Sequence, residues 1–186
     1  MTMIIEKKKL ERDMFRKLRD KSSLNQMKNV EKNVKVYVDS FLNEDKNIGY
    51  LAIYWPLKRE VDIRSLKENF TLALPRCKDK KELLFYPWDE NPLTKDSEGI
   101  LSPNNAFSLT NKEISMILVP CLSVDKNLTR LGYGGGYFDK LRRDNDWRSV
   151  PCIGVLTSNC VSTIPLTKAE WDIPLSGFIT EKEIFV

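Results

Sequence analysis

Histidine is absent from the 186-residue chain. Its absence excludes Ser-His-Asp and Cys-His catalysis, histidine-based zinc sites and a histidine general base. The four cysteines form no CxxC pair, which leaves no local redox or metal motif. Because Cys121 and Cys152 lie in apolar runs, we expect them to be buried thiols.

Long hydrophobic runs are also missing. No apolar stretch approaches the roughly 20 residues that a membrane-spanning helix needs, and the first residues do not resemble a secretion signal. The content of 41% hydrophobic and 30% charged residues is typical of a globular protein in water. We therefore expect a cytoplasmic protein without a membrane partner, folded as one domain over residues 1–186.

The excess of positive charge is confined to the N-terminus. Eight basic and four acidic residues between Glu6 and Lys21 account for the whole net charge of +4. The rest of the chain is neutral overall, so no extended basic stripe indicates a nucleic-acid partner. Leu10, Met14 and Leu18 recur every four residues and predict a basic amphipathic helix over about residues 5–22, with that stripe on the buried face.

Strand-like and helix-like segments alternate along the chain, which predicts an α/β fold with three αβα layers and a mostly parallel sheet. Asp62 is expected to cap a helix that buries Ile63, Leu66 and Phe70 and stops at Pro75. A second helix is expected over Tyr137–Asn145, and a long surface loop over Pro87–Asn105. The expected strands are Ile48–Tyr54, Leu83–Tyr86, Ile114–Pro120, Pro151–Leu156 and, at an edge, Gly177–Phe185.

The stretch from Arg130 to Asp139, RLGYGGGYFD, holds four of the eight glycines. Glycine lets backbone N–H groups approach a ligand closely, and a glycine-rich loop that leads into a helix is suited to phosphate. Arg130 adds a fixed positive charge, and Asp139 adds a carboxylate of the kind that Mg²⁺ shares with phosphates. The alternative is a simple glycine-rich turn followed by an ordinary first-turn acid. The combination of these residues favours a nucleotide site.

Neither of the common phosphate motifs is present. GxxxxGK[ST] does not occur, and GxGxxG fails because Tyr137 stands where its last glycine would be. The loop instead resembles the RLGyGgGYYD motif of the 5-formyltetrahydrofolate cyclo-ligase (methenyltetrahydrofolate synthetase) family. Further segments resemble that family in the same order, and they are Lys8 with Arg12, Glu60, Val119–Asp125, Asp172–Pro174 and Ile179–Glu181.

This resemblance implies a NagB/RpiA/CoA-transferase-like fold and a monomer that converts 5-formyltetrahydrofolate to 5,10-methenyltetrahydrofolate with ATP and Mg²⁺. It implies ATP binding by Lys8, Arg12, Arg130, Leu131, Gly132, Tyr133, Gly134, Gly135, Gly136, Tyr137 and Phe138. It implies folate binding by Trp55, Glu60, Tyr133, Gly135 and Tyr137. It implies metal binding by Asp139 and Asp172, and catalysis by Arg130, Tyr137 and Asp139.

Several residues have a structural alternative. Glu60 could be an exposed loop acid, Asp172 a turn acid, and Phe138 part of the core. The basic contact could come from Arg16–Arg19 instead of Lys8 and Arg12.

The chain also departs from its apparent relatives. Some relatives carry Arg and Lys where this loop has Tyr133 and Gly135, Phe138 replaces a tyrosine, and Ser102-Pro103 replaces a Glu-Pro pair. Other classes that fit part of the sequence are a different ATP-dependent ligase or kinase, a non-catalytic binder and a nucleic-acid module.

Overall fold

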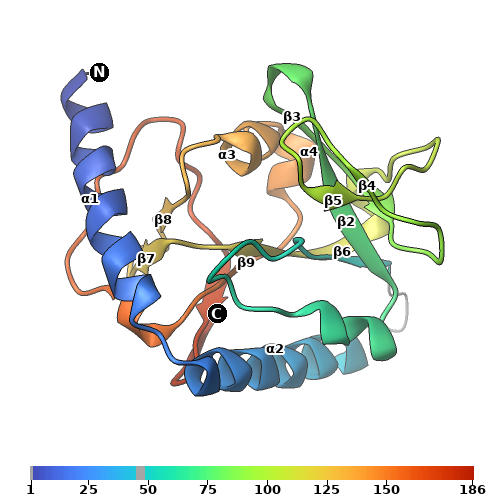
Figure 1. Cartoon of the computed structure of the whole chain (residues 1–186), viewed down its shortest axis with the longest axis horizontal. Coiled ribbons are helices and arrows are strands. Elements are labelled where there is room, and N and C mark those ends of the chain that lie inside the picture. Colours follow the sequence, from blue (N-terminus) through green and yellow to red (C-terminus); the bar gives the residue numbers. More distant parts are fainter. Residues whose placement is uncertain (1, 45–48) are drawn as a thin grey trace.

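A seven-stranded sheet with strand order β12-β11-β9-β6-β1-β2-β3 forms the centre of the computed structural model, which describes residues 2–44 and 49–186 (Figure 1). The strands from β11 to β2 are parallel, and the two outer strands β12 and β3 are antiparallel to their neighbours. The predicted mixed α/β fold with a mostly parallel sheet is therefore confirmed.

The sequence supplies the elements of this sheet in the following order. The helices are α1 (Thr2–Asp20), α2 (Leu24–Glu44), α3 (Tyr137–Leu141) and α4 (Asn145–Arg148). The sheet strands are β1 (Tyr50–Ala52), β2 (Leu72–Lys78), β3 (Glu82–Pro87), β6 (Ile114–Pro120), β9 (Cys152–Val155), β11 (Gly177–Ile179) and β12 (Ile184–Phe185). The smaller strands are β4 (Thr94–Lys95), β5 (Leu101–Ser102), β7 (Ser123–Asp125), β8 (Arg130–Leu131) and β10 (Val161–Ser162).

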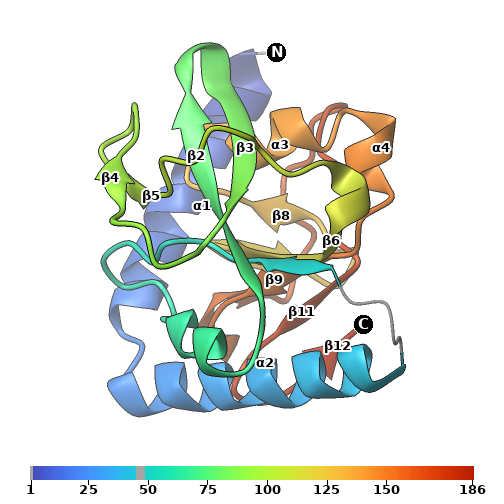
Figure 2. The ribbon, with the colours of Figure 1, turned by 90° about the vertical axis from the view of Figure 1, so that its right-hand side faces the viewer.

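Alternate residues of the central strands point into two separate cores. Met116 and Leu118 of β6 pack with Val34 of α2 on one face of the sheet. Ile117 and Val119 of the same strand pack on the other face, beneath α3 and α4. Figures 1 and 2 show α2 running across one face of the sheet and α3 and α4 lying over the opposite one. A strand buried on both faces reads as a continuous apolar run, which is why Ile114–Pro120 was recognisable as a strand.

The largest element that the pattern did not predict is α2. Its fully buried residues Val30, Val34 and Val38 recur every four positions, which is the spacing of one helix face. The signal was therefore present, but β-branched valines are not strong helix formers and the other positions are mostly polar.

The expected buried stripe of α1 is correct only at Leu18, which packs against two of the cores. Leu10 and Met14 are 70% and 47% exposed, whereas Lys8 and Phe15 are buried. Phe15 packs with Leu131 in a third, small core. The helix therefore turns a face with a buried lysine toward the site, because that lysine meets an ion-pair partner there.

Other elements differ from the expectation in extent. The segment after Asp62 is a short 3-10 turn, Arg64–Glu68, although Asp62 does accept a hydrogen bond from the Arg64 amide at 3.0 Å. Pro75 stops no helix and lies inside β2. The helix expected over Tyr137–Asn145 ends at Leu141.

The strands differ in smaller ways. The short pair β4–β5 lies within the long loop expected over Pro87–Asn105. The expected C-terminal edge strand is two strands, of which β12 alone forms the edge. The first strand is shorter than expected, and Ile48 lies outside the described residues.

In the part of the chain that the structure describes, no helix combines the length and the apolar character that a bilayer crossing requires.

We predict that two truncations on α1 will have opposite outcomes. Phe15→Ala should lower the free energy of unfolding by about 3–5 kcal/mol, because it empties a buried position. Leu10→Ala on the exposed face should change it by less than about 0.5 kcal/mol. Urea unfolding of both variants measures the difference. Equal losses in the free energy of unfolding would show that Leu10 is packed as well as Phe15.

Candidate functional site

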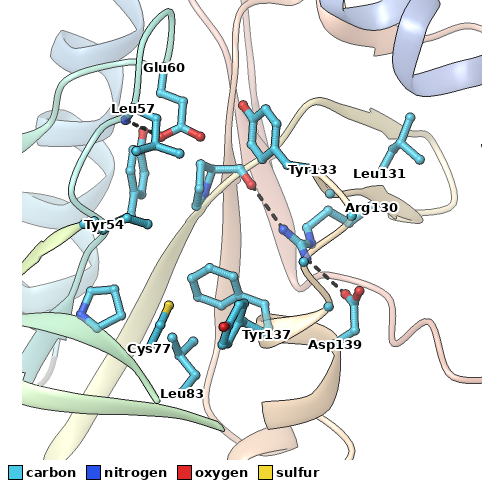
Figure 3. Close-up of a pocket in the computed structure, with 18 of the residues that line it drawn as sticks. Tyr54, Leu57, Glu60, Cys77, Leu83, Arg130, Leu131, Tyr133, Tyr137 and Asp139 are labelled. Atoms are coloured by element: carbon cyan, nitrogen blue, oxygen red, sulfur yellow. Dashed lines mark hydrogen bonds and ion pairs between the residues drawn. The ribbon is translucent and has the colours of Figure 1, made fainter. Parts of the chain in front are cut away.

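All the predicted site residues line one cavity of about 160 Å³, and Figure 3 shows part of its lining. It lies beyond the carboxyl ends of β1 and β6, where ligands commonly bind in parallel sheets. Eight further residues line the cavity without having been predicted as site residues, and they are Tyr54, Leu57, Pro75, Cys77, Leu83, Asp96, Ile100 and Pro120. Three of these belong to the β2–β3 hairpin, and no local motif marks any of them as part of a site.

Backbone conformation explains the glycines of the loop. Gly134 and Gly136 have φ values of +106° and +77°, in the region that side chains disfavour. A Cβ on Gly135 would lie 3.1 Å from the Tyr137 ring, so this position also favours the smallest residue. Within residues 2–44 and 49–186, no protein acceptor takes the amide hydrogens of Gly134 and Gly135. Because α3 has only five residues, these amides and the nearby cations carry the case for phosphate, rather than a helix dipole.

Arg130 connects the end of β6 to the acid of the loop. Its Nη1 donates to the Pro120 carbonyl at 3.2 Å, and its Nη2 donates to Asp139 Oδ1 at 3.0 Å (Figure 3). Its guanidinium carbon also lies 5.4 Å from the centre of the Phe138 ring. Burial would raise the pKa of Asp139, but the charges of Arg130, Lys8 and Arg143 outweigh it and lower that pKa. Asp139 is therefore held ionised, as a cation ligand should be.

The second expected metal ligand, Asp172, forms a buried ion pair with Lys8. The same carboxylate oxygen accepts the Ala169 amide at 2.7 Å, so Asp172 is also a turn acid. In the described ranges, no three His, Cys, Asp or Glu residues gather as a preformed metal cage. Mg²⁺ usually takes only one or two carboxylates and completes its shell with phosphates and water. Asp139 and Asp172, which line the same cavity, fit such a site.

The structure distinguishes between the two candidate basic pairs. Arg12 donates from Nε to the Gly132 carbonyl at 3.0 Å and lines the cavity together with Lys8. Arg16 instead points to solvent and pairs with Asp13 at 2.9 Å. Arg19 lies behind the cavity, with its guanidinium carbon 5.5 Å from the Tyr133 ring centre. Lys8 and Arg12 are thus the N-terminal cations that line the cavity, whereas Arg19 contacts the loop at the Tyr133 ring without lining the cavity.

Glu60 lies at the opposite end of the cavity from Asp139 (Figure 3). Its Oε2 accepts the Leu57 amide at 2.7 Å. Burial raises the pKa of Glu60, while hydrogen bonds from Leu57 and Tyr133 and the charge of Arg19 partly oppose the rise. Tyr133, which was expected to contact both substrates, therefore turns its side chain from the glycine loop toward Glu60 (Figure 3).

Two aromatic residues close the walls of the cavity. Trp55 packs edge-on against Trp88, with ring centres 6.0 Å apart, and carries the Arg64 guanidinium over its face at 4.5 Å. Tyr137 donates its hydroxyl to Glu98 Oε1 at 2.5 Å, and this hydrogen bond to a carboxylate raises the pKa of Tyr137 to about 12. The phenol therefore stays protonated at neutral pH. Phe138 lines the cavity but also packs against the core beneath α3.

A second hollow, a groove of about 480 Å³, lies on the other side of the glycine loop. It shares Lys8, Arg12, Gly134, Gly136 and Asp139 with the first cavity. The remaining lining residues, none of which the sequence analysis assigned to the site, are Ile4, Ile5, Lys81, Lys140, Arg143 and Trp171. The site therefore consists of a mostly apolar cavity and a basic groove that meet at one shared wall.

Comparison with known proteins finds a matching family model, curated relatives and solved structures. The family model described as the 5-formyltetrahydrofolate cyclo-ligase family matches residues 4–181. A 5-formyltetrahydrofolate cyclo-ligase of Haemophilus influenzae is 26% identical over 184 residues, which cover 93% of this chain and 97% of that protein. A probable 5-formyltetrahydrofolate cyclo-ligase of Schizosaccharomyces pombe is 30% identical over 109 residues, 53% of each chain.

Two solved structures share the fold. The 5,10-methenyltetrahydrofolate synthetase of Aquifex aeolicus matches with a TM-score of 0.77 and 27% identity, over 96% of this chain and 91% of that one. The 5,10-methenyltetrahydrofolate synthetase of Mycoplasma pneumoniae matches with a TM-score of 0.70 over 94% and 98% of the two chains. At 23% identity, this second likeness shows the fold alone.

We predict that Glu60→Gln will stabilise the protein increasingly as the pH rises. A carboxyl group whose pKa is raised on folding contributes stability below its unfolded pKa and loses it as the pH passes through the folded value. Glutamine mimics the neutral form, so its advantage in melting temperature should grow from about pH 4 to about pH 7. The control is Glu6→Gln, whose carboxylate is exposed. A constant difference between Glu60→Gln and the unaltered protein across this range would show that Glu60 is not desolvated.

Proposed function

The chain belongs to the 5-formyltetrahydrofolate cyclo-ligase family, and we propose that it converts 5-formyltetrahydrofolate to 5,10-methenyltetrahydrofolate, with cleavage of ATP to ADP and phosphate. One observation carries the proposal. Glu60 at one end and the Arg130–Asp139 pair at the other line the same cavity, so a folate and the end of a nucleotide could meet inside it.

We assign the folate to the cavity and the nucleotide to the groove. Glu60 presents a carboxylate that suits the amino and N–H donors of a pterin ring. Hydrogen bonds from these donors would offset the cost of burying the ionised carboxylate. Trp55 offers an apolar wall beside the ring. The groove is lined by five cationic residues and by one acid, Asp139, which suits a triphosphate.

The chemistry needs positioning and charge neutralisation more than a protein nucleophile. The formyl oxygen of the folate attacks the terminal phosphorus of ATP, and ADP leaves. The phosphorylated oxygen is then a good leaving group, so the N10 nitrogen attacks the formyl carbon, loses its proton, closes the ring and expels phosphate. Arg12 and the free amides of Gly134 and Gly135 bind and orient the phosphates. A chain without histidine can perform these steps.

The shared wall is where the phosphoryl group would pass from the groove to the cavity. Arg130 orients Asp139 and holds positive charge beside the transferring group. Asp139 and Asp172 would hold Mg²⁺, which when bound supplies further neutralisation of phosphate charge. We also propose that the enzyme acts as a monomer on these two small molecules and that its fold is of the NagB/RpiA/CoA-transferase-like type.

The direct test is a spectrophotometric assay. Purified protein is mixed with MgATP and 5-formyltetrahydrofolate, and the absorbance band of the methenyl product is followed, with ATP omitted as the control. Growth of the band only with ATP is the expected result. A flat trace from folded protein that still binds ATP would discard the folate reaction and leave a nucleotide-binding relative.

We predict that Asp139→Asn will leave the fold intact and lower kcat by at least about 100-fold, the scale of losing one electrostatic contact to a transition state. The charge-matched control is Asp39→Asn, at an exposed position on α2. Initial rates at saturating MgATP measure both variants, and circular dichroism reports the fold. Full turnover by folded Asp139→Asn would remove this carboxylate from the mechanism.

A further inference from the structure

The turn between β2 and β3 places a lysine directly over the glycine loop. Lys78 and Glu82 are the last paired residues of the two strands, so residues 79–81 form the turn. From this turn the Lys81 side chain crosses Gly136, with Nζ 3.8 Å from the point where a Cβ of that glycine would stand. Lys81 thereby lines the basic groove, together with Lys8 and Arg12 of α1. A hairpin distant in sequence therefore completes the rim of this groove.

The turn itself does not require lysine. Lys81 has a φ of +59°, a left-handed conformation that residues other than glycine and asparagine adopt only at some cost. The last position of a three-residue hairpin turn commonly takes this conformation, and glycine is the residue that suits it. Non-glycine residues held in such conformations cluster at functional sites. The turn would form more easily with glycine, so the reason for lysine at this position lies in its side chain.

Lys81 also differs from the other cations near the loop because it has no bonding partner in the described part of the chain. Lys8 is paired with Asp172, Arg12 binds the Gly132 carbonyl, and Arg130 is held by Pro120 and Asp139. Within the described part of the chain, Lys81 has no ion pair or hydrogen bond. Its three ammonium donors are therefore available to a ligand without the loss of an existing contact.

The glycine loop cannot easily supply this charge from its own residues. Tyr133 turns toward Glu60, and a side chain at Gly135 would press on the Tyr137 ring at 3.1 Å. Arg130 is the one cation of the loop between Arg130 and Asp139, and it is already bound. A free cation above Gly136 must therefore come from another segment.

We propose that Lys81 is a phosphate-binding catalytic residue, which contacts the terminal phosphate of the nucleotide from the hairpin side of the glycine loop. The proposal rests on the proposed function for the identity of the nucleotide and the reaction. It assigns the β2–β3 hairpin a direct part in the nucleotide site.

The test compares ATP with AMP, which lacks the terminal phosphates. In calorimetric titrations with Mg²⁺ and without folate, Lys81→Met should weaken ATP binding by about 10- to 100-fold, the scale of one hydrogen bond between charged groups. The AMP affinities of Lys81→Met and the unaltered protein should agree within about 2-fold, since AMP has no terminal phosphate for Lys81 to contact. Lys81→Arg should retain most of the ATP affinity, because it keeps the charge.

Lys78→Met is the matched control. It removes the same charge from the same hairpin, but Lys78 is exposed and lines neither the cavity nor the basic groove. Equal ATP affinities of Lys81→Met and Lys78→Met would overturn the proposal, and so would equal losses for ATP and AMP. If Lys81→Met does not fold, Lys81→Gly replaces it, because glycine suits the positive φ of this position.

The ring-closure assay separates this proposal from the proposed function. An unaltered protein that binds ATP but closes no ring would discard the folate reaction, while the titrations would still decide the role of Lys81. Equal affinities with normal ring closure would reject Lys81 alone. An unaltered protein that binds no ATP would overturn both.

Discussion

The buried ion pair between Lys8 and Asp172 is the contact on which the site depends, because it joins residues 164 positions apart. It fixes α1 against the C-terminal segment and so brings Arg12 to the glycine loop. A buried pair adds little stability by itself, but removing one partner leaves a desolvated charge that costs about 3–5 kcal/mol. If Asp172 holds Mg²⁺ as proposed, Lys8 would exchange this carboxylate for a phosphate, so nucleotide and metal would replace the pair together.

Two opposite pKa shifts separate the two ends of the site. Burial raises the pKa of Glu60, whereas the surrounding cations lower the pKa of Asp139 despite its burial. An ionised Asp139 is already compensated and can attract a cation. An ionised Glu60 is poorly compensated and gains most from a ligand that donates hydrogen bonds to it. The two carboxylates therefore select different partners, although they line the same cavity.

The parts of the fold that the sequence predicted well are those with a local signal. The apolar run Ile114–Pro120 forms the predicted strand. The residues of the Arg130–Asp139 motif lie around one cavity, and their roles stay a prediction. The buried face of α1 was not predictable in this way. Leu10 and Met14 of its apolar stripe are exposed, and Lys8 is buried against a partner that only the tertiary fold supplies. The contact between Arg19 and Tyr133 is hidden from the sequence for the same reason.

The departures of this loop from its relatives acquire a physical meaning in the structure. Tyr133 belongs to the Glu60 end of the site, where its hydroxyl partly offsets the burial of that carboxylate. Gly135 leaves room for the Tyr137 ring, which Glu98 holds through the phenol. Tyr133 and Gly135 thus shape the cavity, and neither position adds positive charge to the groove. Cationic side chains from α1, the β2–β3 hairpin, α3 and the turn after α3 surround the groove instead, so its electrostatics depend on the docking of these segments.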